Sequence, residues 1–391
     1  MENTKRIRCV YSIGVPFGYH GTGMIAYYAA RGIYNAGMLK RLICLSHKRT
    51  QIPENLIKDA IPAGRIVCGA IEKLAILLGS ANGYGAKDTI YDKLACLHMV
   101  DCDIFHGWSL ESLESLDSAK QKGAKFTILE RSSSHILKQK SILESEYEKY
   151  HIERPPIDRI EVERNIAAYE KADYIIVPSE FAYESFIELG FNKNKLVLIP
   201  YGYDPQLFKP AARQNNVFRV LFCGSITLRK GVAYLLEAWD RLKFKNAELI
   251  LIGRVFKDAE TILKGCAGKN PSIKIKGFVP HNETTGYYQN ADVFLFPSLE
   301  EGSALVVYEA MAHGLPIITT FNSGSVVRDG IDGFIIKPQD TDSLCDKLQL
   351  LYDNRDKRQQ MGANASGHIK NYTWDKYSER LCGFYNSLIK Q

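Results

Sequence analysis

Short apolar, β-branched segments alternate with helix-length segments along most of the chain, and this alternation occurs twice. The pattern predicts βαβ units, in which neighbouring parallel strands are connected by helices. It stops in 200–216, a segment with three Pro and few apolar residues, which we interpret as a linker. A chain of 391 residues has the length of two to three typical domains. We therefore predict the α/β class, with two doubly wound domains that face each other across a cleft.

The apolar runs give the expected elements of each domain. The predicted strands of the first domain are 7–13, 41–45, 103–105, 126–129, 174–177 and 196–199, with helices at 22–35 and 179–189. The second domain should have strands at 218–223, 248–252, 273–276, 293–296 and 316–319, with a helix at 232–241. Residues 340–391 contain no strand pattern and should form two or three helices. The long stretches 80–90 and 132–160 are predicted to be mobile, lid-like loops.

Composition excludes several classes of protein. Apolar residues at 46% and charged residues at 24% are ordinary globular values, which excludes a disordered or collagen-like chain. The net charge of +6 comes without a long Lys/Arg cluster, so we expect no nucleic-acid partner. Nine scattered cysteines, with no C-x-x-C pair, argue against both a disulfide framework and a zinc site.

The sequence predicts neither export nor membrane insertion. Its start, MENTKRIRCV, has no apolar signal segment, so we expect a cytoplasmic protein. The longest apolar stretch, 66–78, contains Glu72 and Lys73 and is too short for a bilayer, which needs about 20 residues. We predict a core helix there. A surface helix that contacts the inner membrane face near a lipid-linked acceptor is the alternative.

The segment PSLEEGSALVVYEAMAHGLPII predicts a helix from about residue 303 to 313 that is apolar on every side. Glu309 lies in the middle of this helix. A buried carboxylate is costly unless it is paired or hydrogen-bonded. Glu309 is therefore either a structural Glu satisfied by neighbouring groups or a Glu that accepts hydrogen bonds from ligand hydroxyls.

Glu301 lies eight residues before Glu309, which is about 12 Å along a helix axis. Between the two carboxylates, free backbone N–H groups at the helix start and the helix dipole predict an anion site. Its residues are Gly302, Ser303, Ala304 and Leu305. The order carboxylate, anion site, carboxylate matches the hydroxyls, diphosphate and hydroxyls of a nucleotide-diphosphate sugar.

A second segment, GSITLRKG, places Gly224 in a tight turn after a predicted strand, and Arg229 and Lys230 at the start of the next helix. Arg binds phosphate oxygens bidentately and Lys supplies a point charge. In an open α/β sheet this turn should lie beside Glu301, at the carboxyl ends of the strands. The alternative for such a pair of cations is simple exposure to solvent.

The glycine-rich segment GVPFGYHGTG does not fit the dinucleotide fingerprint G-x-G-x-x-G, and no acid follows the second strand. We interpret it as a loop that closes on a phosphate or sugar from the opposite domain. Its candidate residues are Gly18, His20, Gly21, Thr22 and Gly23. His106 and the segment ERSSSH at 130–135 follow other strands at the same edge, so both are further candidates for the cleft.

Together these motifs resemble the GT-B glycosyltransferases of family 4, the glycosyl transferases group 1. PSLEEGSALVVYEAMAHGLPII is similar to their E-x7-E segment and GSITLRKG to their diphosphate-binding turn. The resemblance extends to YEKADYIIVPSEFA, LIPYGYDPQLFKP, KGFV, ADVFLFPS, SGSVVRDGIDGFIIKP and YTWDKYS. It implies an acceptor-binding Rossmann-like domain at 1–205 and a nucleotide-sugar-binding Rossmann-like domain at 206–374. A helix at 375–391 would cross back onto the first domain.

The resemblance also implies roles for single residues. Arg229 and Lys230 would bind the diphosphate, Glu309 the ribose, and Glu301 the hydroxyls of the sugar. The other donor-binding residues would be the 302–305 amides with Gly224, Gly253, Arg254, Phe278 and Val279. The catalytic candidates are Glu301, Arg229, Lys230 and His106, and the 14–23 loop with Arg131 would contact the acceptor. The resemblance implies no metal and no cofactor.

The chain departs from the family pattern at three places. Glu301-Gly302-Ser303-Ala304 stands where many members have E-G-F-G, and Ser225 stands where many have Arg. Many members carry a His after the strand that is expected to end at Leu129, and this chain has Glu130 there. The residues left open as substitutes for that His are Arg131, His106 and His135.

The predicted function is retaining transfer of a sugar from a UDP-sugar or GDP-sugar to a glycan, lipid-linked or small-molecule acceptor, in polysaccharide or glycoconjugate synthesis. One alternative is a phosphorylase of the same fold, which would need a lysine for pyridoxal phosphate, and no motif marks one. Another alternative is a nucleotide-sugar-binding protein without transferase activity. Such a protein would not require both carboxylates and both cations together.

Overall fold

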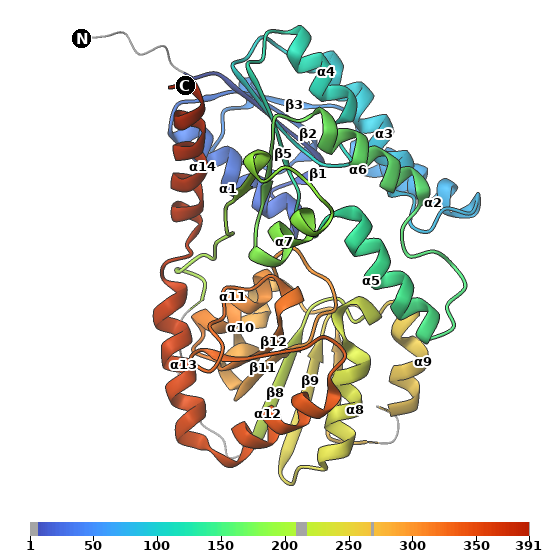
Figure 1. Cartoon of the computed structure of the whole chain (residues 1–391), viewed down its shortest axis with the longest axis vertical. Helices are drawn as coiled ribbons and strands as arrows, with labels where there is room; N and C mark the ends of the chain where they lie inside the picture. Colours follow the sequence, from blue (N-terminus) through green and yellow to red (C-terminus); the bar gives the residue numbers. More distant parts are fainter. Residues whose placement is uncertain (1–6, 209–216, 267–269, 391) are drawn as a thin grey trace.

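The computed structural model describes residues 7–208, 217–266 and 270–390. Two sheets, each flanked by helices, stand one above the other along the long axis of the molecule (Figure 1). The first has seven strands in the order β3-β2-β1-β4-β5-β6-β7, and the second has six in the order β10-β9-β8-β11-β12-β13. All of their strand pairs are parallel. The predicted class, two Rossmann-like doubly wound domains, is confirmed.

The first sheet is covered by helices on both faces, so its middle strand is buried along its whole length, as parallel strands usually are. Its strands are β1 (Cys9–Phe17), β2 (Leu39–His47), β3 (Ile57–Asp59), β4 (Ile104–Trp108), β5 (Phe126–Glu130), β6 (Tyr174–Val177) and β7 (Leu196–Leu198). Its helices are α1 (Thr22–Asn35), α2 (Gly64–Leu77), α3 (Tyr84–Ala95), α4 (Leu113–Gln121), α5 (Ile136–Lys149), α6 (Arg159–Lys171) and α7 (Glu180–Glu188). Short 3-10 turns are η1 (Glu54–Leu56), η2 (Cys96–His98) and η3 (Lys193–Lys195).

The second sheet repeats the arrangement around its own apolar core. Its strands are β8 (Phe218–Cys223), β9 (Ala247–Ile252), β10 (Ile273–Gly277), β11 (Val293–Phe296), β12 (Ile317–Thr320) and β13 (Gly333–Ile336). Its helices are α8 (Val232–Leu242), α9 (Lys257–Cys266), α10 (His281–Asn290), α11 (Leu305–Ala312), α12 (Thr341–Asp353) and α13 (Arg355–Ile369), with 3-10 turns η4 (Leu228–Lys230) and η5 (Phe321–Ser323).

Helix α14 (Trp374–Ile389) leaves the second half of the molecule and packs on the first, beside α1 (Figure 1). Trp374 stacks on Tyr28 with ring centroids 4.5 Å apart, and the Ser378 hydroxyl donates to the carbonyl oxygen of Tyr28. The buried face of α14 follows helical spacing and consists of Trp374, Tyr377, Leu381, Tyr385 and Leu388. The expected crossing of the C-terminal helix onto the first domain is confirmed.

The chain passes between the two halves twice, and the two passages lie side by side. The Tyr203 N–H donates to the carbonyl oxygen of Tyr372 at 3.0 Å, and the Trp374 N–H to that of Tyr203 at 3.3 Å. Gly202 fits this contact because a Cβ on it would lie 2.5 Å from the carbonyl carbon of Thr373. The rest of the predicted linker, 209–216, lies outside the described residues.

Two predictions about the first half are wrong. The stretches 80–90 and 132–160 contain much of α3 and all of α5 rather than long loops. Both helices bury polar side chains, such as Asp92 and Glu146, and this weakens the apolar periodicity by which a helix is recognised. The stretch 66–78 forms most of α2 but not a core helix, because α2 buries only Gly64 and Cys68.

Two edge strands, β3 and β13, were not predicted; they have three and four residues, and β3 buries only one of its three residues. None of the helices in the described part of the chain is both long enough and apolar enough to cross a bilayer.

Candidate functional site

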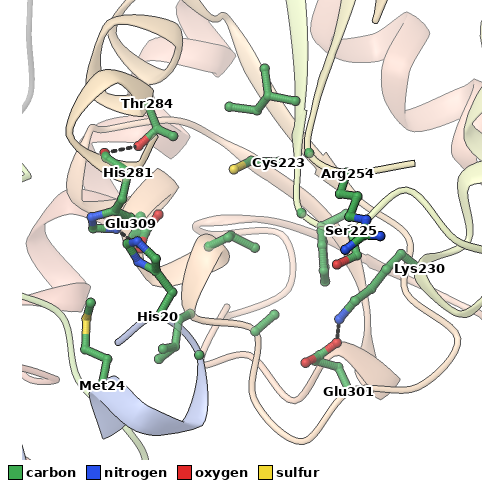
Figure 2. Close-up of a pocket in the computed structure, with 18 of the residues that line it drawn as sticks. His20, Met24, Cys223, Ser225, Lys230, Arg254, His281, Thr284, Glu301 and Glu309 are labelled. Carbon is green, nitrogen blue, oxygen red and sulfur yellow. Dashed lines mark hydrogen bonds and ion pairs between the residues drawn. The ribbon is translucent and has the colours of Figure 1, made fainter. Parts of the chain in front are cut away.

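A cavity of about 590 Å³ lies between the two halves, and groups from both halves line it. The first half contributes the start of α1 with the loop before it, and the second contributes the loops that follow β8, β9, β10 and β11. Open α/β sheets bind ligands at this carboxyl edge of the strands. Figure 2 shows Lys230 and Glu301 on one side of the cavity, and His20, His281 and Glu309 on the other.

Most of the predicted site residues line this cavity. They are Gly224, Arg229, Lys230, Gly253, Arg254, Phe278, Val279, Glu301, Ser303, Ala304, Leu305 and Glu309, with His20, Gly21 and Thr22 of the glycine-rich loop. Gly302, Gly18, Gly23, Arg131 and His106 do not line it. The cavity also has lining residues that sequence reasoning did not propose, among them Ser132, Cys223, Phe256, His281 and Phe296.

The turn after β8 holds the two predicted cations. The Thr227 side chain caps η4 by accepting the Arg229 N–H, and its hydroxyl donates to Asp258 at 2.6 Å. Lys230 is buried and forms an ion pair with Glu301, which also accepts a hydrogen bond from Arg229 Nη1 at 3.1 Å. The two cations therefore converge on Glu301, as expected from the edge that these loops share.

Two glycines allow the loops after β8 and β9 to touch. Gly224 and Gly253 have φ of 144° and 143°, in a region that other residues rarely adopt. A Cβ on Gly253 would lie 1.8 Å from the carbonyl oxygen of Gly224. This contact brings the Gly224 turn and Arg254 to the same wall of the cavity.

Glu309 lies in α11 with its side chain 12% exposed at the cavity wall. Its Oε1 contacts His281 Nε2 at 3.1 Å, and its Oε2 accepts a hydrogen bond from the Tyr288 hydroxyl at 2.9 Å. The hydrogen bond to Glu309 raises the pKa of His281. The neighbours thus satisfy the carboxylate, as the structural interpretation expects, and they also orient it toward the cavity.

The start of α11 differs from the expected anion site in one of its backbone N–H groups. The helix begins at Leu305, so Ala304 takes the N-cap position instead of lying in the first turn. The Ala304 N–H donates to the carbonyl oxygen of Ser323 at 3.0 Å and is not free for a ligand. Gly302 does not line the cavity, and a Cβ on it would lie 1.8 Å from the carbonyl oxygen of Ser132 in the other half.

Glu300 is a buried charged residue that sequence reasoning missed. It accepts hydrogen bonds from the Ser133 hydroxyl at 2.6 Å, the Ser134 hydroxyl at 2.8 Å and the Gln139 amide at 3.1 Å, all from the first half. Arg229 Nη1 lies 3.4 Å from it. Burial opposes ionisation, but Arg229 and the serine hydrogen bonds lower the pKa of Glu300 below its usual value. Glu300 thus links the two halves to the cation turn.

The residues proposed as substitutes for the missing His lie outside the cavity, so a direct catalytic role for His106 is not supported. His106 is fully buried, with Nδ1 2.6 Å from the Tyr385 hydroxyl of α14. Arg131 donates to the carbonyl oxygen of Ser134 at 2.9 Å and so supports the 132–134 loop. His135 caps α5, and burial lowers its pKa to about 4.

His20 and His281 are the histidines among the described lining residues. Their rings face each other with centroids 5.6 Å apart, one from each half of the molecule. Burial, followed by the charge of His281, lowers the pKa of His20. His281 could have been found in the sequence, because it follows β10 by four residues and so lies at the carboxyl edge of the sheet, where the other site residues lie.

The second half of the chain matches a known protein family, and the match agrees with the fold and with the position of the cavity. Residues 217–354 match the family of glycosyl transferases group 1, and this match confirms the resemblance seen in the motifs.

Among similar curated proteins are the capsular polysaccharide biosynthesis glycosyltransferase CapM of Staphylococcus aureus, 26% identical over 237 residues, and the D-inositol 3-phosphate glycosyltransferase of Corynebacterium urealyticum, 27% identical over 261 residues. The alignments cover 58% and 60% of this chain, and 62% and 61% of those proteins. The chain thus spans about three fifths of the length of these relatives.

Similar solved structures have the same GT-B fold. Sucrose-phosphate synthase from Thermosynechococcus elongatus superposes with a TM-score of 0.70 at 18% identity, covering 98% of this chain and 99% of that one. HepE of Anabaena, in complex with UDP and glucose, has a TM-score of 0.66 at 14% identity and covers 97% of this chain and 100% of its own.

Proposed function

We propose that the protein is a retaining glycosyltransferase that moves a sugar from a nucleotide-diphosphate sugar to an acceptor held by the first domain. One observation carries the proposal: two carboxylates, Glu301 and Glu309, and two cations, Arg229 and Lys230, line a single cavity between the domains. A nucleotide-diphosphate sugar has hydroxyls at both ends and negative charge between them, which matches these groups.

The proposed chemistry is front-face substitution. The bond between the anomeric carbon and a diphosphate oxygen breaks while the acceptor oxygen bonds to the same face of that carbon. The leaving diphosphate oxygen takes the proton of the acceptor hydroxyl, so the reaction needs no base or metal from the protein. Arg229 and Lys230 would stabilise the departing diphosphate. Groups aimed at developing negative charge are worth about 10²–10³-fold in rate each.

The donor is proposed to be a UDP-sugar or a GDP-sugar. HepE, which has the same fold, has structures in complex with UDP and with UDP-glucose, and this favours UDP. Arg254 and the exposed ring of Phe278 lie at the cavity wall where the base would bind. An exposed aromatic face can stack on a base.

The acceptor is proposed to be a glycan or lipid-linked glycan in polysaccharide or glycoconjugate synthesis, in line with the name of CapM. We propose that residues 1–205 bind it, that 206–374 bind the donor, and that 375–391 form the returning helix. His20, Gly21 and Thr22 lie between the two binding regions and would close over both substrates.

The test begins with a thermal-shift screen against UDP, GDP, ADP and their sugars. The nucleotide that stabilises the protein identifies the donor, and transfer to a glycan acceptor is then followed by mass spectrometry, with NMR of the product to show retention of configuration. Lys230→Ala and Glu309→Ala should both lose turnover. If both variants turn over donor like the wild type, the assignment of the site is wrong.

The alternative is a nucleotide-sugar-binding protein of the same fold. It would bind UDP or GDP tightly but would neither hydrolyse the donor nor transfer the sugar to any acceptor. Inversion of the anomeric configuration would refute the retaining mechanism and leave glycosyl transfer intact.

Peripheral membrane contact is proposed through α2. Ile66, Leu74 and Leu77 of this helix are 78%, 58% and 83% exposed, and Arg65 and Lys73 add positive charge. An apolar face with flanking cations fits an anionic lipid surface. Leu74→Glu with Leu77→Glu should abolish co-sedimentation with anionic vesicles, whereas Leu97→Glu, an exposed leucine outside α2, should not. Equal sedimentation of both variants would exclude this face.

A further inference from the structure

A cluster of metal-ligating side chains lies at the edge of the first sheet, outside the cavity. Cys44 and Asp59 are direct partners in the register of β2 and β3, and His47 ends β2. The Cys44 Sγ, a His47 ring nitrogen and an Asp59 carboxylate oxygen lie within 4.8 Å of one another. In the described part of the chain this is the one group of three such side chains that could hold a metal ion.

The contacts within the cluster converge on one point. Asp59 Oδ1 accepts a hydrogen bond from Cys44 Sγ at 3.3 Å and lies 2.8 Å from His47 Nδ1. The other ring nitrogen, His47 Nε2, lies 2.9 Å from Oε2 of Glu54 in η1. A His47 that donates to both carboxylates carries protons on both nitrogens. A divalent cation at this point would replace the Nδ1 proton and the thiol proton.

Glu54 supplies an independent indication of a metal site. A histidine that binds a metal through one nitrogen usually donates its other N–H to a carboxylate, which orients the ring. The contact between His47 Nε2 and Glu54 reproduces this arrangement and leaves Nδ1 directed at Asp59, which also contacts Cys44.

We propose that Cys44, His47 and Asp59 bind a zinc ion, with Glu54 orienting His47. Zinc is favoured because thiolate, imidazole and carboxylate are its usual protein ligands, whereas magnesium and calcium take oxygen ligands alone. Three protein ligands leave a fourth, tetrahedral position for water. That position opens to solvent, since the side chains of His47 and Asp59 are 19% and 40% exposed.

The zinc would not take part in the proposed transfer, because none of its ligands lines the cavity. It would join β2 to β3 at a point next to the glycine-rich loop. Lys48, which follows His47, has its ammonium 3.9 Å from the centre of the Tyr19 ring, and Arg65 donates to the Tyr19 hydroxyl at 3.0 Å. The metal would therefore fix the segment that supports Tyr19.

The test uses the full chain after removal of metals with a chelator. We expect one equivalent of zinc to bind in competition with a chromophoric chelator, and one equivalent of cobalt to give a thiolate-to-cobalt charge-transfer band. Cys44→Ser should lose the band, and Glu54→Gln should weaken binding by about 10- to 100-fold. Cys68→Ser is the matched control, since Cys68 is also a buried thiol of the first domain but lies outside the cluster.

Zinc should also raise the melting temperature of the wild type and of Cys68→Ser but not that of Cys44→Ser. His47→Gln gives a second test if Cys44→Ser fails to fold, and it too should lose the cobalt band. The proposal is overturned if the wild type binds no stoichiometric zinc, or if a folded Cys44→Ser or His47→Gln binds cobalt as the wild type does. The three side chains would then form only a hydrogen-bonded contact between β2 and β3.

Discussion

Replacing Glu309 by Gln tests the proposed donor site at one carboxylate. His281 Nε2 and the Tyr288 hydroxyl each contact one of its oxygens, at 3.1 and 2.9 Å, and the side chain reaches the cavity. Each carboxylate oxygen keeps a further lone pair that could accept a ribose hydroxyl. Gln has the same shape, but it removes the charge and turns one acceptor oxygen into a donor.

The expected effect follows from one lost bond. A hydrogen bond to a charged group is worth about 1.5–3 kcal/mol. Since 1.4 kcal/mol is a factor of ten in affinity, the Kd for the nucleotide should rise about 10- to 150-fold. The same change puts the Gln NH₂ donor opposite His281 or Tyr288, and that partner loses its acceptor. The free energy of unfolding should therefore fall by about 1–3 kcal/mol.

Isothermal titration calorimetry with the nucleotide found in the thermal-shift screen measures the first effect, and urea unfolding measures the second. Glu283→Gln is the control, because Glu283 is an exposed carboxylate in the first turn of α10, outside the cavity. Tyr288→Phe should lower stability while it leaves the carboxylate in place. If Glu309→Gln loses stability but binds nucleotide with the wild-type Kd, Glu309 is a structural carboxylate and the ribose role is refuted.

Four further outcomes test other parts of the molecule. Lys230→Ala should lower kcat about 10²–10³-fold through lost charge stabilisation of the leaving diphosphate, whereas the exposed Lys245→Ala should not, in an assay of donor turnover. Glu309 raises the pKa of His281 in the folded protein. Their pairing therefore stabilises the fold fully below the pKa of an unfolded histidine, about 6.5, and this stabilisation is lost as the pH rises through the raised pKa of the folded state. The unfolding free energies of wild type and His281→Asn, measured at a series of pH values, should converge at high pH. Glu300→Ala should lower the free energy of unfolding by about 1–3 kcal/mol in urea, because it leaves the Ser133 and Ser134 hydroxyls without their acceptor while Arg229 keeps Glu301, and an unchanged midpoint would contradict the linking role. Gly253→Ala should lower the free energy of unfolding by about 1–3 kcal/mol or more and abolish nucleotide binding. Gly265→Ala, with open space around its Cβ, should change neither stability in urea nor nucleotide affinity.

The fold was predictable because most strands contain a short, mainly apolar run between helix-length segments. Strands 174–177, 218–223 and 293–296 were predicted with the bounds that the structure has. Runs of this kind result from burial on both faces, which is a property of parallel sheets as a whole. The helices α3 and α5 escaped prediction because each buries polar side chains, such as Asp92 and Glu146, which interrupt the apolar periodicity that indicates a helix.

The candidate site divides in a similar way. Arg229, Lys230, Glu301 and Glu309 could be predicted, because strand ends of parallel sheets share one edge and carry these charges there. Glu300 could not, since its partners Ser133 and Ser134 come from the other half, and only the packing of the two halves brings them together. The position of His106 could not be predicted for a related reason: its strand reaches the right edge, but the ring is buried against Tyr385 of α14 and does not line the cavity.

The return of α14 to the first half has a consequence for how the chain acquires its structure. Tyr377, Leu381 and Tyr385 belong to the apolar core of the first sheet, although they follow the entire second domain along the chain. During synthesis the core of the first domain therefore stays incomplete, with this part exposed to water, until the second domain and α14 have been made. Long chains usually fold domain by domain from the N-terminus, but with this topology the first domain cannot finish folding before the second is made. A ribosome-bound intermediate should therefore depend on chaperones until α14 emerges.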